Sequence, residues 1–204
     1  MPVMIGYPAG RPPPVHGPAT VRPGDSGPAV RALQERLRAL AYDPGAVNGR
    51  YGDDTRAAVW AFQKVQRMLP DGVVDGPVWS ALAAPRTPRT PGRERNRVEV
   101  DLRRQLLVAY RRGHVVLITH VATGKPGWRT PAGDFHVTRR VAGWRHAPLG
   151  YMYRPLYFYR GYAMHGSRNV PLHPASHGCV RIPMHTADLL PKLVRDGEPV
   201  HVRR

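Results

Sequence analysis

The spacing of apolar residues changes at one proline-rich stretch of the chain. Before this stretch, which reads APRTPRTPGRER over residues 84–95, apolar side chains recur at helical spacing; after it, short runs rich in β-branched residues alternate with Gly and Pro turns. Such a change predicts two domains, and 204 residues are enough for each to bury a core. The predicted order is a flexible Pro/Gly-rich leader over 1–20, a small all-α three-helix module over 21–84, a Pro/Arg linker over 85–96 and a mainly β domain over 97–204.

Three amphipathic helices are expected in the module. Their apolar stripes are Val30, Leu33, Leu37 and Leu40 in the first and Ala58, Val59, Phe62 and Val65 in the second. Asp25 or Ser26 is expected to cap the first helix, and Asp75 a short third one with Pro77 in its first turn. The stripes are expected to form the core of the module. In the β domain, a short helix is expected after Pro183 with Thr186 as its cap.

The chain is strongly basic, with a formal net charge of +17. From Arg93 onward there are 20 Lys and Arg against 7 Asp and Glu, which places +13 of this charge in the C-terminal part of the chain. Such an excess can attract nucleic acid, an anionic membrane or an acidic polymer. The sequence lacks the basic aromatic motifs of RNA-binding sheets and the spaced Cys/His pairs of zinc fingers, so nucleic acid is not expected as a partner. No run approaches the roughly 20 apolar residues that span a bilayer, so no stable membrane insertion is expected.

The single cysteine, Cys179, lies in the stretch MHGSRNVPLHPASHGCVRIP, residues 164–183, close to three histidines. A lone cysteine cannot form an internal disulfide, so it is either a buried bystander or a working thiol. A thiol becomes a strong nucleophile as the thiolate, which requires a nearby base or positive charge. His177 would share a face with Cys179 on an extended segment. His165 ends a strand-like run, and a hairpin-like return of the chain would bring it opposite the thiol.

Two neighbours of the thiol add to this pattern. Gly178 lets the backbone approach a substrate closely, and the N–H groups of Gly178 and Cys179 are expected to donate to the oxyanion of a tetrahedral intermediate. Arg181 supplies a fixed positive charge for the thiolate or for a substrate carboxylate. Together these groups describe acyl transfer through a thioester. Two alternatives stay open: the cysteine is only a small buried apolar residue, or it binds zinc together with the histidines. The zinc ligands would be His165, His173, His177 and Cys179, whose spacing matches none of the common short ligand patterns.

The first domain resembles the peptidoglycan-binding domain 1 family over about residues 21–83. The resemblance is carried by the runs GDSGPAVRALQERLRALAY, NGRYGDDTRAAVWAFQKVQ and DGVVDGPVWSAL, which present a Gly-Asp-x-Gly opening, an x-Phe-Gln helix and an Asp-Gly-x-Val-Asp turn in that order. It implies affinity for the bacterial cell wall. It does not identify the residues that contact the wall.

The second domain resembles the L,D-transpeptidase catalytic domain, the YkuD family, over about residues 97–203. MHGS followed by PASHGCVRIP is similar to that family's pattern of His-Gly, a spacer and Ser/Thr-His-Gly-Cys-x-Arg/Asn, and ATGKPGWRTPAGDFHV is similar to its Thr-Gly and Thr-Pro-x-Gly-x-Phe block. The resemblance implies a β-sandwich-like fold and peptidoglycan stem peptides as substrate. The catalytic residues that it implies are Cys179 as nucleophile, His165 as its base, Gly166 as the carbonyl that orients the imidazole, and His177, Gly178 and Arg181 as the rest of the motif.

The same resemblance implies a lid over the site, and aromatic residues before His165 are expected to line a donor groove. The expected substrate-binding residues are Ser176, Ser167, Tyr157 and Trp144, the two serines as hydrogen-bonding supports. In the implied reaction the thiolate attacks a tetrapeptide stem after an L-centre and releases D-alanine, and an acceptor amine then forms a 3→3 crosslink. Water as acceptor would make the enzyme an L,D-carboxypeptidase. Two further alternatives stay open: another wall hydrolase, dependent on the same thiol or on zinc, and a non-catalytic wall-binding or nucleic-acid-binding protein. No metal or organic cofactor is implied, and carbapenems are the expected inhibitors.

The implied substrate lies outside the cytoplasm, so an extracytoplasmic location, in the cell wall or periplasm of a bacterium, is expected. The opening residues MPVMIGYPAGRPPPVHGPAT lack the basic start and continuous apolar core of a secretory signal. We therefore expect either that the sequence begins downstream of a signal or that the protein stays inside. A wall-binding module on a flexible linker would raise the local concentration of wall substrate around the catalytic domain. The oligomeric state is not predicted by the sequence.

Overall fold

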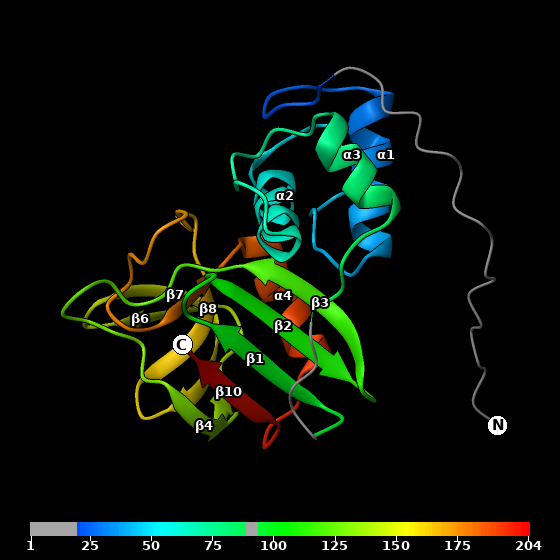
Figure 1. Ribbon diagram of the computed structural model, residues 1–204. Helices are drawn as coiled ribbons and strands as arrows, with labels where there is room; N and C mark the ends of the chain where they lie inside the picture. Colours follow the sequence, from blue (N-terminus) through cyan, green and yellow to red (C-terminus); the bar gives the residue numbers. More distant parts are fainter. Residues whose placement is uncertain (1–19, 89–93) are drawn as a thin grey trace.

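The computed structural model describes residues 20–88 and 94–204, which form a helical module placed on a mainly β domain (Figure 1). The expected leader and the middle of the linker, residues 1–19 and 89–93, lie outside the described residues. Within the described ranges, no helix combines the length and apolar character needed to cross a membrane. The predicted fold class, a three-helix module followed by a mainly β catalytic-type domain, is confirmed.

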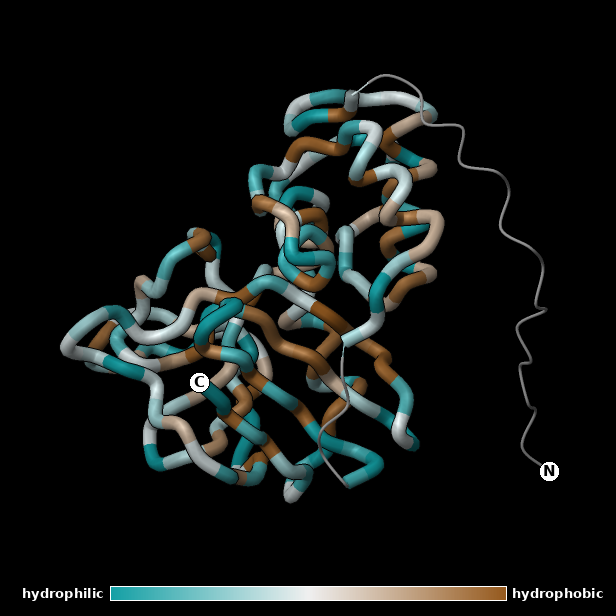
Figure 2. The backbone as a smooth tube through the Cα atoms, in the orientation of Figure 1, coloured by the Kyte–Doolittle hydropathy of each residue, from teal (hydrophilic) through white to brown (hydrophobic). Residues whose placement is uncertain are grey.

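The module consists of three short helices whose apolar stripes face one another. They are α1 (Pro28–Ala39), α2 (Asp53–Gln66) and α3 (Gly76–Ala83). Leu33, Leu37 and Phe62 are fully buried, as the helical spacing of the stripes predicts. The hydropathy colouring in Figure 2 shows apolar segments on the sides of these helices that face each other.

The helix caps agree with the sequence in α3 but not in α1. Oδ1 of Asp75 accepts a hydrogen bond from the N–H of Val78 at 3.2 Å, so Asp75 caps α3 as predicted. The prediction for α1 was wrong, because Gly27 is its N-cap residue and no side chain caps it. Asp25 instead accepts the N–H of Arg22 at 2.7 Å and closes the preceding turn.

The β domain contains two sheets. The first has the order β3-β2-β1-β10-β4, and its strands are β1 (Arg97–Asp101), β2 (Leu106–Arg111), β3 (His114–His120), β4 (Gly133–His136) and β10 (Pro199–Arg203). The second has the order β5-β7-β8-β9, with β6 paired to β7, and its strands are β5 (Arg139–Arg140), β6 (Trp144–Ala147), β7 (Gly150–Tyr159), β8 (Tyr162–Gly166) and β9 (Val180–Ile182).

The inner faces of the two sheets and one helix enclose a common core. Val98 and Leu107 of the first sheet and Phe158 and Met164 of the second lie in one buried cluster. Leu190 joins it from α4 (Met184–Leu193), which follows Pro183 as expected. The expected cap was wrong, because Thr186 lies inside α4, where its hydroxyl donates to Oδ2 of Asp43 at 2.7 Å.

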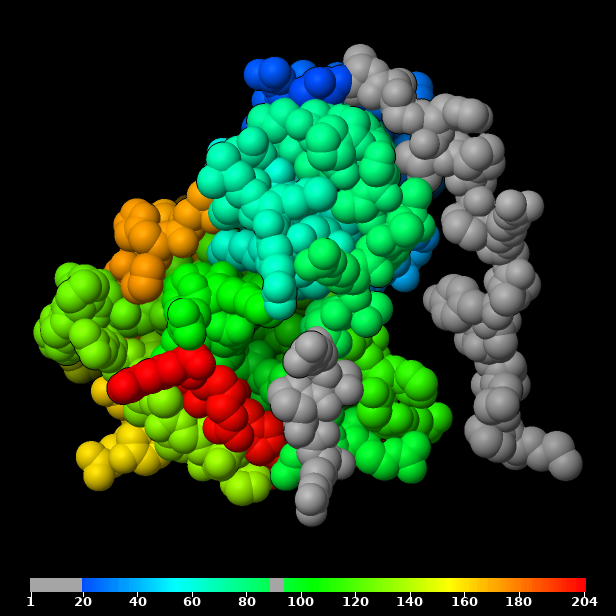
Figure 3. Space-filling model, in the orientation of Figure 1, coloured from blue at the N-terminus to red at the C-terminus, as the bar shows by residue number. Residues whose placement is uncertain are grey.

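The outer face of the first sheet carries the module. Leu106, Val108 and Tyr110 of β2 and Ile118 of β3 belong to the same buried cluster as Phe62 of the module, and the N–H of Ile118 donates to the carbonyl of Ala41 at 2.7 Å. The space-filling view shows the module seated directly on the β domain (Figure 3). The two domains therefore share a core, a contact that the sequence analysis did not predict.

Candidate active site

The expected catalytic residues lie at the ends of two neighbouring parallel strands. β8 and β9 pair in parallel, with His165 opposite Arg181 and Gly166 opposite Ile182. The hairpin-like return expected from the sequence was wrong, because the chain crosses over through residues 167–179 before it re-enters the sheet. Since side chains two residues apart share a face of a strand, Cys179 and Arg181 face the same side as His165.

These side chains open into one cavity of about 530 Å³. The expected site residues that line it are His165, Ser167, Ser176, His177, Cys179, Arg181 and Tyr157. The β6–β7 hairpin over residues 145–152, which includes the exposed Tyr151 and Leu149, also lines this cavity. The structure thus brings the thiol, the imidazole and the guanidinium to one solvent-accessible hollow.

His165 is held in a single orientation. Its Nδ1 lies 3.0 Å from the carbonyl oxygen of Gly166, and since that oxygen can only accept, Nδ1 carries the proton and donates. Nε2 is then left as the proton acceptor. Burial, together with the charge of Arg181, lowers the pKa of His165 to about 4, so the imidazole is neutral at neutral pH. A neutral, oriented imidazole has the protonation state that a general base requires.

Cys179 is half-buried beside β8. Burial raises the pKa of its thiol, while a backbone hydrogen bond from Ala163 and the charge of Arg181 act in the opposite direction. Its Sγ contacts the carbonyl oxygen of Gly161 at 3.9 Å. Over residues 20–88 and 94–204, no hydrogen bond joins this thiol to His165. The resting pair is accordingly a neutral thiol and a neutral imidazole in one cavity, a geometry that catalytic pairs without substrate often show.

The turn that carries the thiol is fixed by two buried hydroxyl groups. Ser176 Oγ donates to the carbonyl of Cys179 at 2.5 Å and accepts the N–H of Gly178 at 3.0 Å. On the other side, Thr130 Oγ1 donates to the carbonyl of Gly178 at 2.7 Å and accepts the N–H of Gly124 at 2.9 Å. One correction follows, because the Gly178 N–H, expected to face an oxyanion, is already bonded to Ser176. Ser176 is a hydrogen-bonding support, as expected, and both of its hydrogen bonds hold the turn.

Gly178 occupies a place that only glycine fits. Its φ is +113°, and a Cβ there would lie 2.4 Å from Cε1 of Tyr162. The next side chain back, His177, packs against the indole of Trp128 with ring centroids 5.0 Å apart and planes at 84°. The close fit of the turn against two aromatic rings keeps Cys179 at the entrance to β9.

The expected substrate-binding residues are placed unequally. Tyr157 is buried at the cavity wall, with the guanidinium of Arg139 4.3 Å from its ring centroid. Ser167 bonds to Asn169 on both sides of its hydroxyl. Trp144 lies outside the main cavity, in an adjacent open hollow of about 450 Å³ that it shares with Tyr151 and with the 166–168 segment.

One group at the site was not identified from the sequence. Thr130 lies in the Thr-Pro-x-Gly-x-Phe block, so the resemblance already pointed to its position but not to its bond with Gly178. Tyr151 is one of the aromatic residues expected to line a donor groove, and the pairing of β6 with β7 places it at the cavity. Among the described residues, no three His, Cys, Asp or Glu side chains gather closely enough to hold a metal ion, so the zinc alternative has no ligand set there.

Comparison with known proteins agrees with this geometry. The sequence profile of the L,D-transpeptidase catalytic domain (YkuD) matches residues 95–202, and that of a peptidoglycan-binding domain family (PG_binding_1) matches residues 26–82. A solved L,D-transpeptidase (residues 123–326) from Xylanimonas cellulosilytica superposes with a TM-score of 0.85 at 37% identity, over 92% of this chain and 98% of that one.

Two further relatives are more distant or shorter. An L,D-transpeptidase (Yku) from Stackebrandtia nassauensis shares the fold, with a TM-score of 0.55 at 22% identity over 90% of this chain and 95% of that one. An uncharacterized protein from the bpoA1 3′ region of Kitasatospora aureofaciens is 46% identical over 59 residues, which are 28% of this chain and 50% of that protein. With the catalytic-domain profile spanning more than half of its length, this chain belongs to the L,D-transpeptidase catalytic domain (YkuD) family.

Proposed function

We propose that this protein is a cysteine-dependent L,D-transpeptidase that forms 3→3 crosslinks between peptidoglycan stem peptides outside the cytoplasm, in the cell wall or periplasm of a bacterium. One observation carries the proposal: the thiol of Cys179 and the neutral, oriented imidazole of His165 share one cavity with Arg181. Membership in the YkuD family supplies the class of reaction.

In the first half of the reaction, Sγ of Cys179 attacks the carbonyl carbon that follows an L-centre in a donor tetrapeptide stem. The thiol proton passes to Nε2 of His165, while Nδ1 keeps its own proton and continues to donate it to the carbonyl of Gly166. The tetrahedral intermediate then collapses, the C–N bond breaks, and the amine of D-alanine leaves with the proton from the imidazolium. The product is a thioester on Cys179.

In the second half, an acceptor amine from a neighbouring stem attacks the thioester. Its proton passes to Nε2 of His165, the C–S bond breaks, and the leaving thiolate takes the proton back. The new amide is the 3→3 crosslink, and the thiol and the neutral imidazole are regenerated. The chemistry uses groups of the chain alone and needs no cofactor.

Charge that develops during both steps is stabilised from two directions. Since the N–H of Gly178 is bonded to Ser176, the oxyanion is expected to rely on the N–H of Cys179. Arg181, on the same face of β9 and at the cavity wall, supplies a fixed positive charge for the thiolate or for a stem carboxylate. The peptidoglycan-binding module is expected to hold glycan or stem peptides near this cavity.

Intact-protein mass spectrometry after incubation with a carbapenem such as meropenem tests the nucleophile. Wild type is expected to gain one covalent adduct, and Cys179→Ala none. His165→Gln is expected to acylate about 10² to 10⁴ times more slowly. An adduct of equal yield on Cys179→Ala would refute Cys179 as the nucleophile.

Disaccharide-tetrapeptides then test the reaction. Crosslinked dimers with release of D-alanine are the expected products. Tripeptides with D-alanine but no dimer would instead identify an L,D-carboxypeptidase that uses the same cysteine.

A further inference from the structure

A fully buried histidine, His120, connects the helical module to the crossover loop of residues 167–178, which precedes the thiol. It is the last residue of β3. Its Nε2 lies 3.1 Å from the carbonyl of Val170 and 3.0 Å from that of Pro171, and its Nδ1 lies 2.7 Å from Nζ of Lys64. Nδ1 also lies 3.3 Å from the carbonyl of Gln105, a longer contact than the one to Lys64. Because carbonyls only accept and the ammonium only donates, the two carbonyls at Nε2 and the shorter Lys64 contact at Nδ1 assign the proton to Nε2, and Nδ1 accepts from Lys64. The ring is thus a neutral bridge from module to loop.

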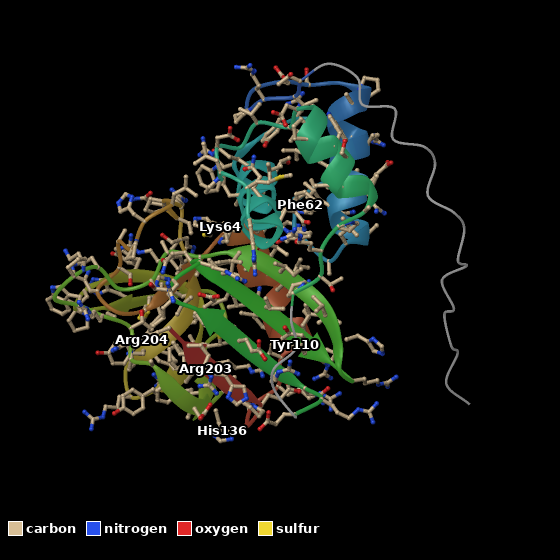
Figure 4. The ribbon with its side chains drawn as sticks, in the orientation of Figure 1. Phe62, Lys64, Tyr110, His136, Arg203 and Arg204 are labelled. Atoms are coloured by element: carbon tan, nitrogen blue, oxygen red, sulfur yellow. The ribbon has the colours of Figure 1, made fainter. Side chains whose placement is uncertain are left out.

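The module holds this ring with two side chains of α2. Lys64 is in its last turn, and Nζ donates to the carbonyl of Gln105 at 3.2 Å as well as to His120. Trp60, one turn earlier, packs edge to face on the imidazole with centroids 5.3 Å apart and planes at 87°. Figure 4 shows Lys64 extending from α2 toward the sheet.

A second branch runs from Gln105 to the other end of the same loop. Gln105 donates from Nε2 to Thr123 Oγ1 at 2.7 Å and accepts the N–H of Thr123 at Oε1 at 2.8 Å. The carbonyl of Thr123 then accepts the N–H groups of Ala175 at 2.9 Å and Ser176 at 3.0 Å. Ser176 in turn holds Gly178 and Cys179. Gln105, Thr123 and Ser176 therefore form a continuous series of hydrogen-bonded residues from Lys64 to the turn that carries the thiol.

We propose that Lys64 of the helical module is a positioning residue for Cys179: through His120 and Gln105 it holds both ends of the crossover loop in place. The expected effect on acylation and crosslinking rates rests on the proposed function. The positioning of the loop does not, because it can be measured without any reaction. Burial lowers the pKa of Lys64 to about 8, and burial together with the charge of Lys64 lowers the pKa of His120 to about 4. Placing these two groups between the domains therefore costs more free energy than a contact that only docks the domains would require. An apolar pair of the same size would join the domains without desolvating an ammonium group.

The decisive variant is Lys64→Met in the full chain, because methionine keeps an unbranched apolar stem of similar length and removes the donor. The first readout is amide hydrogen exchange over residues 167–178, which is expected to become at least about tenfold faster. The second readout is kinetic. The rate of carbapenem acylation and the kcat for crosslinking are expected to fall about tenfold or more. KM and binding to isolated cell walls are expected to change less than twofold. Lys64→Gln, which is too short to reach both partners, serves the same test if Lys64→Met does not fold.

Asp43→Asn is the matched control. Asp43 also joins the module to the β domain, with Oδ1 2.8 Å from Nδ1 of His185 and Oδ2 accepting from Thr186, and both of these direct partners lie in α4. From there only the long 3.4 Å contact of Thr186 Oγ1 with Thr119 Oγ1 leads back toward β3. Asp43→Asn is expected to lower the melting temperature while leaving loop exchange and acylation at the wild-type rate. A double-mutant cycle of Lys64→Met with His120→Phe tests the path itself. Non-additive effects of the two substitutions on loop exchange would place Lys64 and His120 on one path.

Two results would overturn the inference: loop exchange in Lys64→Met equal to wild type, or an equal loosening of the loop in Asp43→Asn. Failure of the proposed function looks different. In that case wild type itself takes up no carbapenem on Cys179, while Lys64→Met still loosens the loop, which supports the positioning role and removes only its catalytic meaning.

Discussion

His165 and Arg181 lie directly opposite each other in the parallel β8–β9 pair, so a permanent positive charge lies beside the proposed base. Burial and this charge lower the pKa of His165 to about 4. The base must be neutral to accept the thiol proton, so acylation is expected to be insensitive to its titration above about pH 5 and to fall as the pH drops through about 4. Rates of carbapenem acylation between pH 3.5 and 8 give the profile.

Arg181→Gln provides the comparison for that profile. Removing the charge raises the pKa of His165, so the acid limb is expected to move to higher pH, but not the whole way to the ordinary histidine value because burial is the larger cause. An acid limb near pH 6.5 in the wild type would contradict a depressed pKa.

Ser176→Ala is expected to destabilise the turn of the nucleophile. It leaves the N–H of Gly178 and the carbonyl of Cys179 without their partner, which costs about 1–3 kcal/mol of unfolding free energy. Acylation is expected to slow as the thiol loses its fixed place. Urea unfolding and acylation rates measure the two effects. The control Ser80→Ala, whose exposed hydroxyl bonds only to Gly76 within α3, is expected to stay within about 0.5 kcal/mol of wild type.

Gly178→Ala is expected to abolish most of the acylation. The new methyl group would overlap the ring of Tyr162, and the φ of +113° strains any L side chain, so the turn must shift. Gly76→Ala in α3 is the matched control, since nothing lies within 4 Å of a Cβ there. Melting temperature and acylation rate should both separate the two variants. Wild-type acylation in Gly178→Ala would show that the turn tolerates the shift.

Ile118→Ala tests whether the two domains share a core. Ile118 belongs to the β domain but is buried among residues of the module, and its truncation is expected to cost about 2–5 kcal/mol. Helical circular dichroism at 222 nm and near-ultraviolet aromatic signals should then shift together in one unfolding transition. Two separate transitions, with only one affected, would mean that the domains unfold independently.

The stability of the wild type is expected to depend on Lys64 above neutral pH. Its folded-state pKa is lowered to about 8 by burial, whereas the unfolded chain keeps the ordinary lysine value of about 10.4. Between these values the unfolded state binds more protons, so this group makes the protein more stable as the pH rises. Melting temperatures from pH 7 to 10.5 should therefore rise in wild type relative to Lys64→Met, and parallel curves would contradict the shift.

The sequence predicted the parts of this fold that local chemistry decides. The stripe around Phe62, the Asp75 cap and the grouping of Cys179 with His165 follow from spacing or from a short motif. The direction of β9 did not, because a 13-residue crossover, residues 167–179, permits either a parallel or an antiparallel return. The placement of Ser176 and Thr130 around Gly178 depends on that crossover.

The sequence of β2, rather than that of the helices, contains a signal that the module docks on the first sheet. β2 reads LLVAYR, and its first five residues are all buried. A continuous apolar run of this kind is typical of a strand covered on both faces, whereas a strand with one solvated face alternates. The identity of the second cover could not be deduced, because the contact between Ile118 and Ala41 joins residues far apart in the sequence.

The shared core around Phe62 and Ile118 gives the enzyme a fixed reach. A catalytic domain on a loose tether samples a sphere of nearby substrate, whereas a docked one meets only what lies at one distance and one angle from the bound strand. If the proposed function holds, a wall segment bound by the module would lie at a fixed distance from the thiol. The spacing of crosslinks along a glycan strand would then be a property of this protein's shape.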